Sequence, residues 1–149
     1  MFSQNSPWII LFFLSAAGCS SRVDKWVQAR PEVFPTSGVV MFDGKPLAEA
    51  LVTFHSDESN VSSYAKTDET GKFQLTTFEP NDGVVAGRHH VCVTKYKEPA
   101  VSQVPVELRS APIPAPNLIP MRYGDPDKSE LTANVASNGE NHFVYRLDK

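Results

Sequence analysis

Hydrophobic and polar positions alternate with a period of two along most of residues 36–147, as in β-strands that bury one face. The clearest case is residues 72–76, where Phe73 and Leu75 alternate with polar neighbours. Similar segments, separated by turn signals, occur around residues 40–42, 50–55, 64–67, 88–96, 131–135 and 143–147. No stretch after residue 30 keeps a period of 3.6 over a normal helix length. The pattern predicts an all-β fold, a seven-stranded antiparallel β-sandwich.

Two turn signals separate the first predicted strands. Asp43-Gly44 is typical of a hairpin turn, and Gly71 ends residues 68–71 where a left-handed conformation is needed. Aromatic side chains are expected to fill the space between the sheets: Phe42, Phe54, Phe73, Phe143 and Tyr145. On the predicted strand 88–96, one face carries His89, Val91 and Val93, and the other carries His90, Cys92 and Thr94.

Residues 99–126 interrupt the β pattern. They contain 7 prolines in 28 residues, and proline cannot donate to a sheet ladder. We therefore expect a long extended crossover here rather than sheet.

The first 18 residues contain no charged side chain, and an apolar stretch runs from Trp8 to Gly18. It is shorter than the roughly 20 residues that span a bilayer, and it fits the core of an export signal. Residues 16–19, Ala-Ala-Gly-Cys, resemble the bacterial lipobox. The resemblance implies a signal peptide over residues 1–18, cleavage between Gly18 and Cys19, and lipidation of Cys19. The alternatives are an ordinary signal peptide, with Cys19 incidental, and an uncleaved anchor.

The remaining sequence divides into two parts. Residues 19–35 lack a clean period and are interpreted as the lipidated N-terminus and a flexible tether. Residues 36–149 are long enough to form one domain with its own core. The net charge of −3, without a visible basic stripe, disfavours a nucleic-acid partner. Two cysteines exclude a disulfide-rich scaffold and a four-thiolate zinc site.

Residues 38–54 and 67–75 resemble the two signature blocks of the carboxypeptidase regulatory-like domain. Small bacterial lipoproteins with this domain also share features similar to residues 87–95, 118–126 and 129–132. The resemblance implies a transthyretin-like, or prealbumin-like, seven-stranded sandwich. The matching residues are turn and core positions, so they imply a fold and no particular chemistry.

The histidines do not predict a convergent site. His89 and His90 are adjacent on one strand, so they point to opposite faces and cannot chelate one ion. His89 is expected to be a core imidazole, and His55 and His142 could meet only through folding. His90 and Cys92 lie about 7 Å apart along the strand, too far for a direct hydrogen bond. We expect no catalytic residue, no metal ligand and no cofactor.

Together these features predict a lipid-anchored, non-catalytic module on the extracytoplasmic side of the bacterial cell envelope, on its periplasmic or outer-membrane face. It would contact the membrane through its N-terminal lipid and bind an envelope protein or contribute to structure. The alternatives are an accessory domain for a separate envelope enzyme, or a metal-handling or hydrolytic protein that uses His55, His89, His90 and His142. Trp26 and Tyr123 are the aromatic residues outside the strands that could support a sugar, so specific glycan binding is not favoured.

Overall fold

The computed structural model describes residue 26 and residues 29–97 and 116–149. The chain forms two compact units, Met1–Arg30 and Pro31–Lys149. The described residues of the first unit are Trp26, Ala29 and Arg30. The predicted signal peptide with Gly18 and Cys19, and most of the proline-rich segment, lie outside the described residues.

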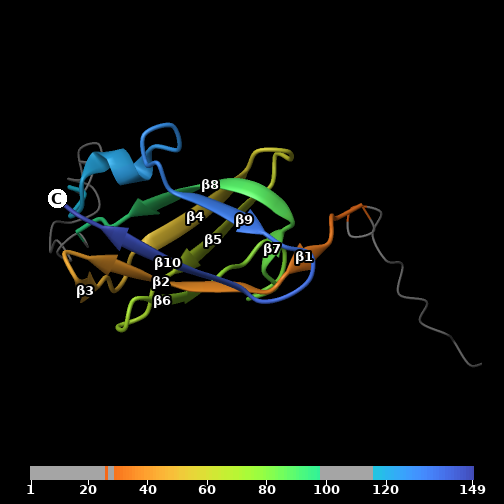
Figure 1. Cartoon of the computed structure of the whole chain (residues 1–149), viewed down its shortest axis with the longest axis horizontal. Helices are drawn as coiled ribbons and strands as arrows, with labels where there is room; N and C mark the ends of the chain where they lie inside the picture. The colour runs from red at the N-terminus through yellow and green to blue at the C-terminus, as the bar shows by residue number, and fades with distance from the viewer. Residues whose placement is uncertain (1–25, 27–28, 98–115) are drawn as a thin grey trace, which may run out of the picture. The chain divides into compact units, whose positions relative to one another are not determined.

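The described part of the second unit contains ten strands and one short 3₁₀ turn (Figure 1). The strands are β1 (Val33–Phe34), β2 (Thr36–Phe42), β3 (Lys45–Pro46), β4 (Leu51–Ser56), β5 (Ser62–Lys66), β6 (Lys72–Gln74), β7 (Val84–Val85), β8 (Gly87–Thr94), β9 (Thr132–Val135) and β10 (Asn141–Leu147). The 3₁₀ turn, η2, spans Met121–Gly124. The all-β prediction is confirmed.

The strands form three sheets. One four-stranded sheet has the order β5-β4-β8-β9, and the other contains β10, β2 and β3, with β6 also paired to β2. A small sheet pairs β1 with β7. The Asp43-Gly44 turn joins β2 to β3, with φ angles of 48° and 76°, as the turn signal predicts.

The strand β10 runs parallel to β2, in register from the pair Asn141 and Thr36 to the pair Leu147 and Phe42. The prediction of a wholly antiparallel fold is therefore wrong for this pair. The chain leaves β9 in one sheet and enters β10 in the other, so no hairpin dictates the direction of β10 (Figure 1). A period of two determines which side chains face inward, but it does not determine strand direction.

The two four-stranded sheets contact each other through aromatic rings. The ring of Phe54 on β4 lies edge-on to Phe73, Phe143 and Tyr145 of the other sheet, with centroids 6.4, 5.8 and 6.2 Å away. Phe42 and Phe143 are only partly buried, whereas the other predicted aromatic core residues are buried. The full buried core consists of Val40, Leu47, Ala50, Val52, Phe54, Ala65, Phe73, Leu75, Val84, Val91, Val93, Ile119, Tyr123, Ala133, Val135, Tyr145 and Leu147.

The compact unit begins at Pro31 rather than at residue 36. Val33 pairs with Val85 and Phe34 with Val84, so the end of the predicted tether belongs to the fold. This strand is only two residues long, which is too short for an alternating pattern to be visible in the sequence. A Cβ at Gly83, where φ is +104°, would collide with the Phe34 carbonyl, so glycine permits the close approach of β1.

The described end of the proline-rich segment is folded onto β8 rather than simply extended. The turn η2 packs on this strand, and a Cβ at Gly124 would approach the Thr94 side chain to 2.9 Å. The Asp148 carboxylate accepts hydrogen bonds from Tyr123 at 2.7 Å and Arg122 at 2.5 Å. These bonds fix η2 to the residue that follows β10.

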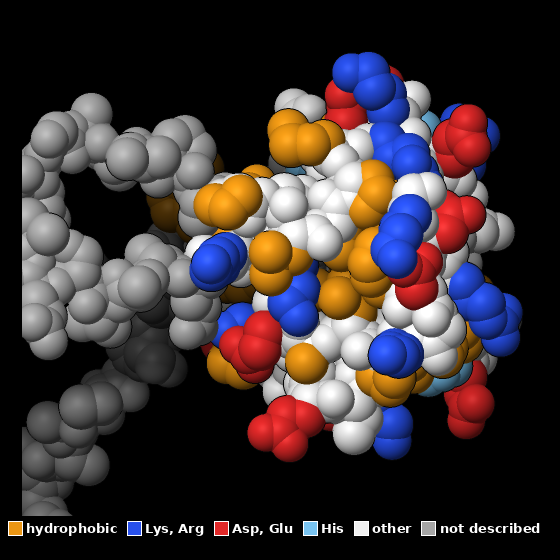
Figure 2. Space-filling view, turned by 90° about the vertical axis from the view of Figure 1, so that its left-hand side faces the viewer, with side chains coloured by type: hydrophobic (Ala, Val, Ile, Leu, Met, Phe, Trp, Pro, Cys, Tyr) orange, Lys and Arg blue, Asp and Glu red, His pale blue; other side chains and the backbone are white. Residues whose placement is uncertain are grey.

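The end of the molecule that carries β3 has a mixed surface (Figure 2). Hydrophobic side chains gather near the middle of this face, and Lys and Arg are interspersed with Asp and Glu around them (Figure 2). No continuous basic stripe is visible on this face.

We predict that Phe54→Ala lowers the free energy of unfolding by about 3–5 kcal/mol, because the change leaves a cavity where the two sheets meet. Urea denaturation followed by circular dichroism measures the effect. The control is Leu51→Ala on the same strand, since Leu51 is 43% exposed and its loss should cost only about 0.5 kcal/mol. Equal losses in the two variants would contradict this account of the core.

Candidate functional site

The four histidines are distributed over both sheets. His55 on β4 is directly opposite His90 on β8, His89 is buried inside, and His142 lies on β10. Folding thus brings together only His55 and His90 as direct strand partners. Among residues 26, 29–97 and 116–149, no group of three or more His, Cys, Asp or Glu side chains could hold a metal ion.

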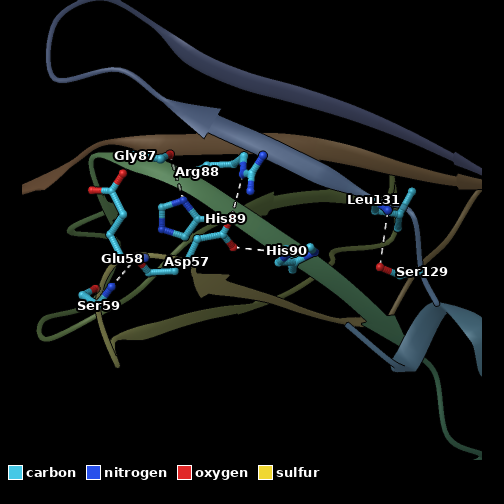
Figure 3. Close-up of polar contacts among 10 residues, drawn as sticks. Asp57, Glu58, Ser59, Gly87, Arg88, His89, His90, Ser129 and Leu131 are labelled. Carbon is cyan, nitrogen blue, oxygen red and sulfur yellow. Dashed lines mark hydrogen bonds and ion pairs between the residues drawn. The ribbon is translucent and has the colours of Figure 1, made fainter. Parts of the chain in front are cut away.

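Asp57 fixes the loop after β4 to the start of β8 (Figure 3). One carboxylate oxygen accepts a hydrogen bond from Nε of Arg88 at 2.6 Å, and the other lies 3.4 Å from Nε2 of His90. The Asp57 backbone N–H also donates to the carbonyl of Arg88 at 3.0 Å. The hydrogen bond from Arg88 lowers the pKa of Asp57, although desolvation acts in the opposite direction. His90 is therefore part of a structural contact between loop and strand.

His89 is a core residue, as the strand pattern predicts. Only 1% of the residue is exposed, and its ring centroid lies 6.0 Å from that of Phe54. Its Nδ1 lies 3.1 Å from the Gly87 carbonyl and donates to it, so the neutral ring carries its proton on Nδ1 (Figure 3). Burial lowers the pKa of His89, and this effect outweighs the Gly87 carbonyl and the carboxylates of Asp57 and Glu58.

Cys92 lies on the other face of β8 and is a buried free thiol. The turn η2 packs on the same strand. Burial raises the pKa of the Cys92 thiol, and the charge of Asp125 raises it further. The thiolate is the reactive form of cysteine, so this environment disfavours a nucleophilic role.

A hollow in the surface lies where β5 meets β6, and we call it the β5–β6 groove. Its main part has a volume of about 770 Å³. A second hollow of about 430 Å³ shares four of its lining residues, Ser37, Gln74, Asn81 and His142, so the two form one elongated groove. The residues of the main part are Ser37, Gly38, Leu51, Tyr64, Ala65, Lys66, Asp68, Lys72, Phe73, Gln74, Thr76, Asn81 and His142.

Backbone hydrogen bonds join the two sides of the groove. The N–H of Tyr64 donates to the Thr76 carbonyl at 3.0 Å, and the N–H of Thr76 donates back at 2.9 Å. The Asn81 N–H donates to the hydroxyl of Thr76 at 2.9 Å. Where the two hollows meet, the Ser37 hydroxyl lies 3.0 Å from Nδ1 of His142. Neighbouring strands thus place several polar side chains along one groove.

Asp82 holds the turn that carries Asn81, a residue that lines both hollows. Its carboxylate accepts hydrogen bonds from the backbone N–H groups of Thr77, Phe78 and Glu79 at 2.7, 2.9 and 2.8 Å. Burial acts to raise the pKa of Asp82, but these donors outweigh it, and the pKa is lowered overall. The turn that carries Asn81 is therefore fixed before any ligand arrives.

The groove was not predicted from the sequence. Tyr64 occupies the outward parity of its strand, where a large aromatic residue is a signal for surface binding, and it is 56% exposed. Of the two aromatic residues considered for sugar binding, Trp26 is 82% exposed, whereas Tyr123 is buried, with only 6% of the residue exposed. Tyr123 is therefore not a surface platform. The meeting of β5 with β6 depends on tertiary contacts, which local alternation does not encode.

Comparison of the chain with models of protein families, with curated proteins and with solved structures finds no match. The family resemblance thus rests on the sequence blocks alone. Among the residues that the structure describes, no helix is both long and apolar enough to cross a bilayer.

We predict that His89 makes the stability of the fold depend on pH. The pKa of His89 is below its ordinary value of 6.5 in the folded chain, so the unfolded state binds more protons between these two values. The stability that the fold gains from keeping the His89 ring neutral is fully present above pH 6.5. It is lost as the pH falls from 6.5 through the pKa of His89 in the folded chain. Urea unfolding at several pH values measures the slope.

The variant His89→Phe should show a shallower pH dependence than the wild type over this range, whatever its absolute stability. The control is His142→Gln, because His142 is exposed and its loss should leave the slope unchanged. An undiminished slope in His89→Phe would refute the assignment to His89.

Proposed function

We propose that this chain is a lipid-anchored, non-catalytic binding or structural module on the extracytoplasmic side of a bacterial envelope. The observation that carries the proposal is the order of segments along the chain. An uncharged apolar stretch leads through Ala16, Ala17 and Gly18 to Cys19, and a compact β unit starts at Pro31. This order fits export, cleavage before Cys19 and attachment of lipid to its thiol.

Lipidation would attach the chain to the membrane, which is its proposed partner. A single acyl chain binds a membrane only marginally, whereas two or more chains anchor it stably. The thiol of Cys19 and the amine freed by cleavage would together carry two or three chains. Residues 20–30 could then reach at most about 40 Å from the anchor, which keeps the β unit close to the membrane.

For the fold of the β unit, we propose the transthyretin-like sandwich of the carboxypeptidase regulatory-like domain. Seven of the strands have three or more residues. Of these, β2, β6 and β10 lie in one sheet and β4, β5, β8 and β9 in the other, and their aromatic side chains meet between the sheets. This division supports the proposed sandwich.

The contacts of the histidines support a non-catalytic role. His89 packs against Phe54 in the core, and His90 lies beside Asp57. The Nδ1 of His55 lies 3.0 Å from the Ser62 hydroxyl, and His142 pairs with Ser37. Each imidazole thus has its own local partner.

We predict that Cys19→Ala abolishes incorporation of a fatty-acid label and leaves the precursor uncleaved at this position. The two cysteines of the sequence provide a matched control, because Cys92→Ala should be labelled and processed like the wild type. Labelled cells and mass spectrometry of the N-terminal peptide measure the result. An unmodified thiol at Cys19 in the wild type would overturn the proposal in favour of simple secretion. Equal labelling of Cys19→Ala would contradict Cys19 as the site of lipidation.

A further inference from the structure

We propose that the β5–β6 groove binds a neutral linear glycan, with the Tyr64 ring as the surface on which a sugar stacks. The proposal names a ligand class for the binding module, and to that extent it rests on the proposed function. The geometry of the groove itself does not depend on the lipid anchor.

The shape of the groove suits a chain-like ligand. Its main hollow, at about 770 Å³, falls within the size range of small-molecule sites. The second hollow extends it past Ser37 and His142 toward Glu140 and Asn141 at the start of β10. A ligand that fills both hollows would be elongated and would pass over the strand pair β2 and β10.

An exposed aromatic ring lines the main hollow. Tyr64 is 56% exposed although it lies within a strand that is paired on one side and bridged on the other. Its backbone is therefore fixed while its ring remains accessible. Leu51, 43% exposed, also lines the hollow. Tyrosine offers an apolar ring with a polar tip, and a pyranose presents C–H groups on its faces and hydroxyls at its rim.

Neutral polar groups also line the groove. Gln74 and Asn81 contribute amides, and Ser37 and Thr76 contribute hydroxyls. Amides and hydroxyls both donate and accept hydrogen bonds, which is what the hydroxyls of a sugar require. The Asp82-centred turn fixes the backbone of Asn81 in advance, and such pre-organisation reduces the entropy lost on binding.

The charges of the groove disfavour a polyanion. Lys66 forms an ion pair with Glu49. Lys72 lies beside Asp68, whose carboxylate accepts a hydrogen bond from the Lys72 backbone at 3.0 Å and whose pKa the lysine charge helps to lower. Each lysine in the groove thus has a carboxylate nearby. A groove with balanced charge fits a neutral polymer better than a nucleic acid or a sulfated polysaccharide.

The test measures binding of oligosaccharides to the full chain purified in detergent, by isothermal titration calorimetry. The probes are cellohexaose, chitohexaose and maltohexaose, with heparin as the polyanion. At least one neutral hexasaccharide should bind, and Tyr64→Ala should weaken that binding by about tenfold or more through loss of the aromatic contact. Tyr64→Phe, which keeps the ring, should stay within about threefold of the wild type.

Tyr96→Ala is the matched control, because Tyr96 is also 56% exposed but does not line the groove. It should leave affinity unchanged. If Tyr64→Ala does not fold, Gln74→Ala replaces it as the test of the groove. Gln74 lines both hollows, so its loss should also weaken glycan binding. The proposal is overturned if no neutral hexasaccharide binds, if heparin binds more tightly, or if Tyr96→Ala costs as much as Tyr64→Ala.

This experiment and the lipid-labelling experiment can fail independently. Loss of glycan binding with Cys19 still lipidated would remove the ligand class and leave the anchored module in place. Glycan binding without lipidation would support the groove as a glycan site and contradict the lipid anchor.

Discussion

The contact between Phe54 and the facing sheet is the constraint on which the rest of this fold depends. Three aromatic rings from two strands, β6 and β10, surround it within 6.4 Å. None of these rings can be buried by its own sheet alone, because each lies on a face that needs a second layer. The Asp57 loop, which follows β4, and η2, which packs on β8, both rest on strands of these sheets.

The groove follows from the way in which the two sheets adjoin at one side. The paired backbone bonds between Tyr64 and Thr76 link β5, an edge strand of one sheet, to the chain beyond β6 of the other. The outward faces of both strands then form a single hollowed surface. Such a bridge also occupies backbone groups that a bare edge would offer to another chain.

The sequence was informative wherever a feature is local. The inward parity of Phe73, Val91 and Tyr145 follows from a period of two, and the Asp43-Gly44 turn follows from the chemistry of its residues. The direction of β10 and the pairing of His55 with His90 could not be read in this way. They depend on which strands become neighbours, and alternation carries no information about neighbours. The burial of Tyr123 was hidden for a different reason, because Asp148, its partner, lies 25 residues away.

The parallel pairing of β10 with β2 has a consequence for the order of assembly. Ser37 and His142 are neighbours across this pair although they lie 105 positions apart along the chain. Contacts between such distant residues slow folding, because a long loop must close before they form. During synthesis, β2 therefore leaves the ribosome long before the strand that completes its edge. Until then, one side of β2 offers unpaired backbone groups, so the nascent chain must be kept from pairing this edge with another molecule.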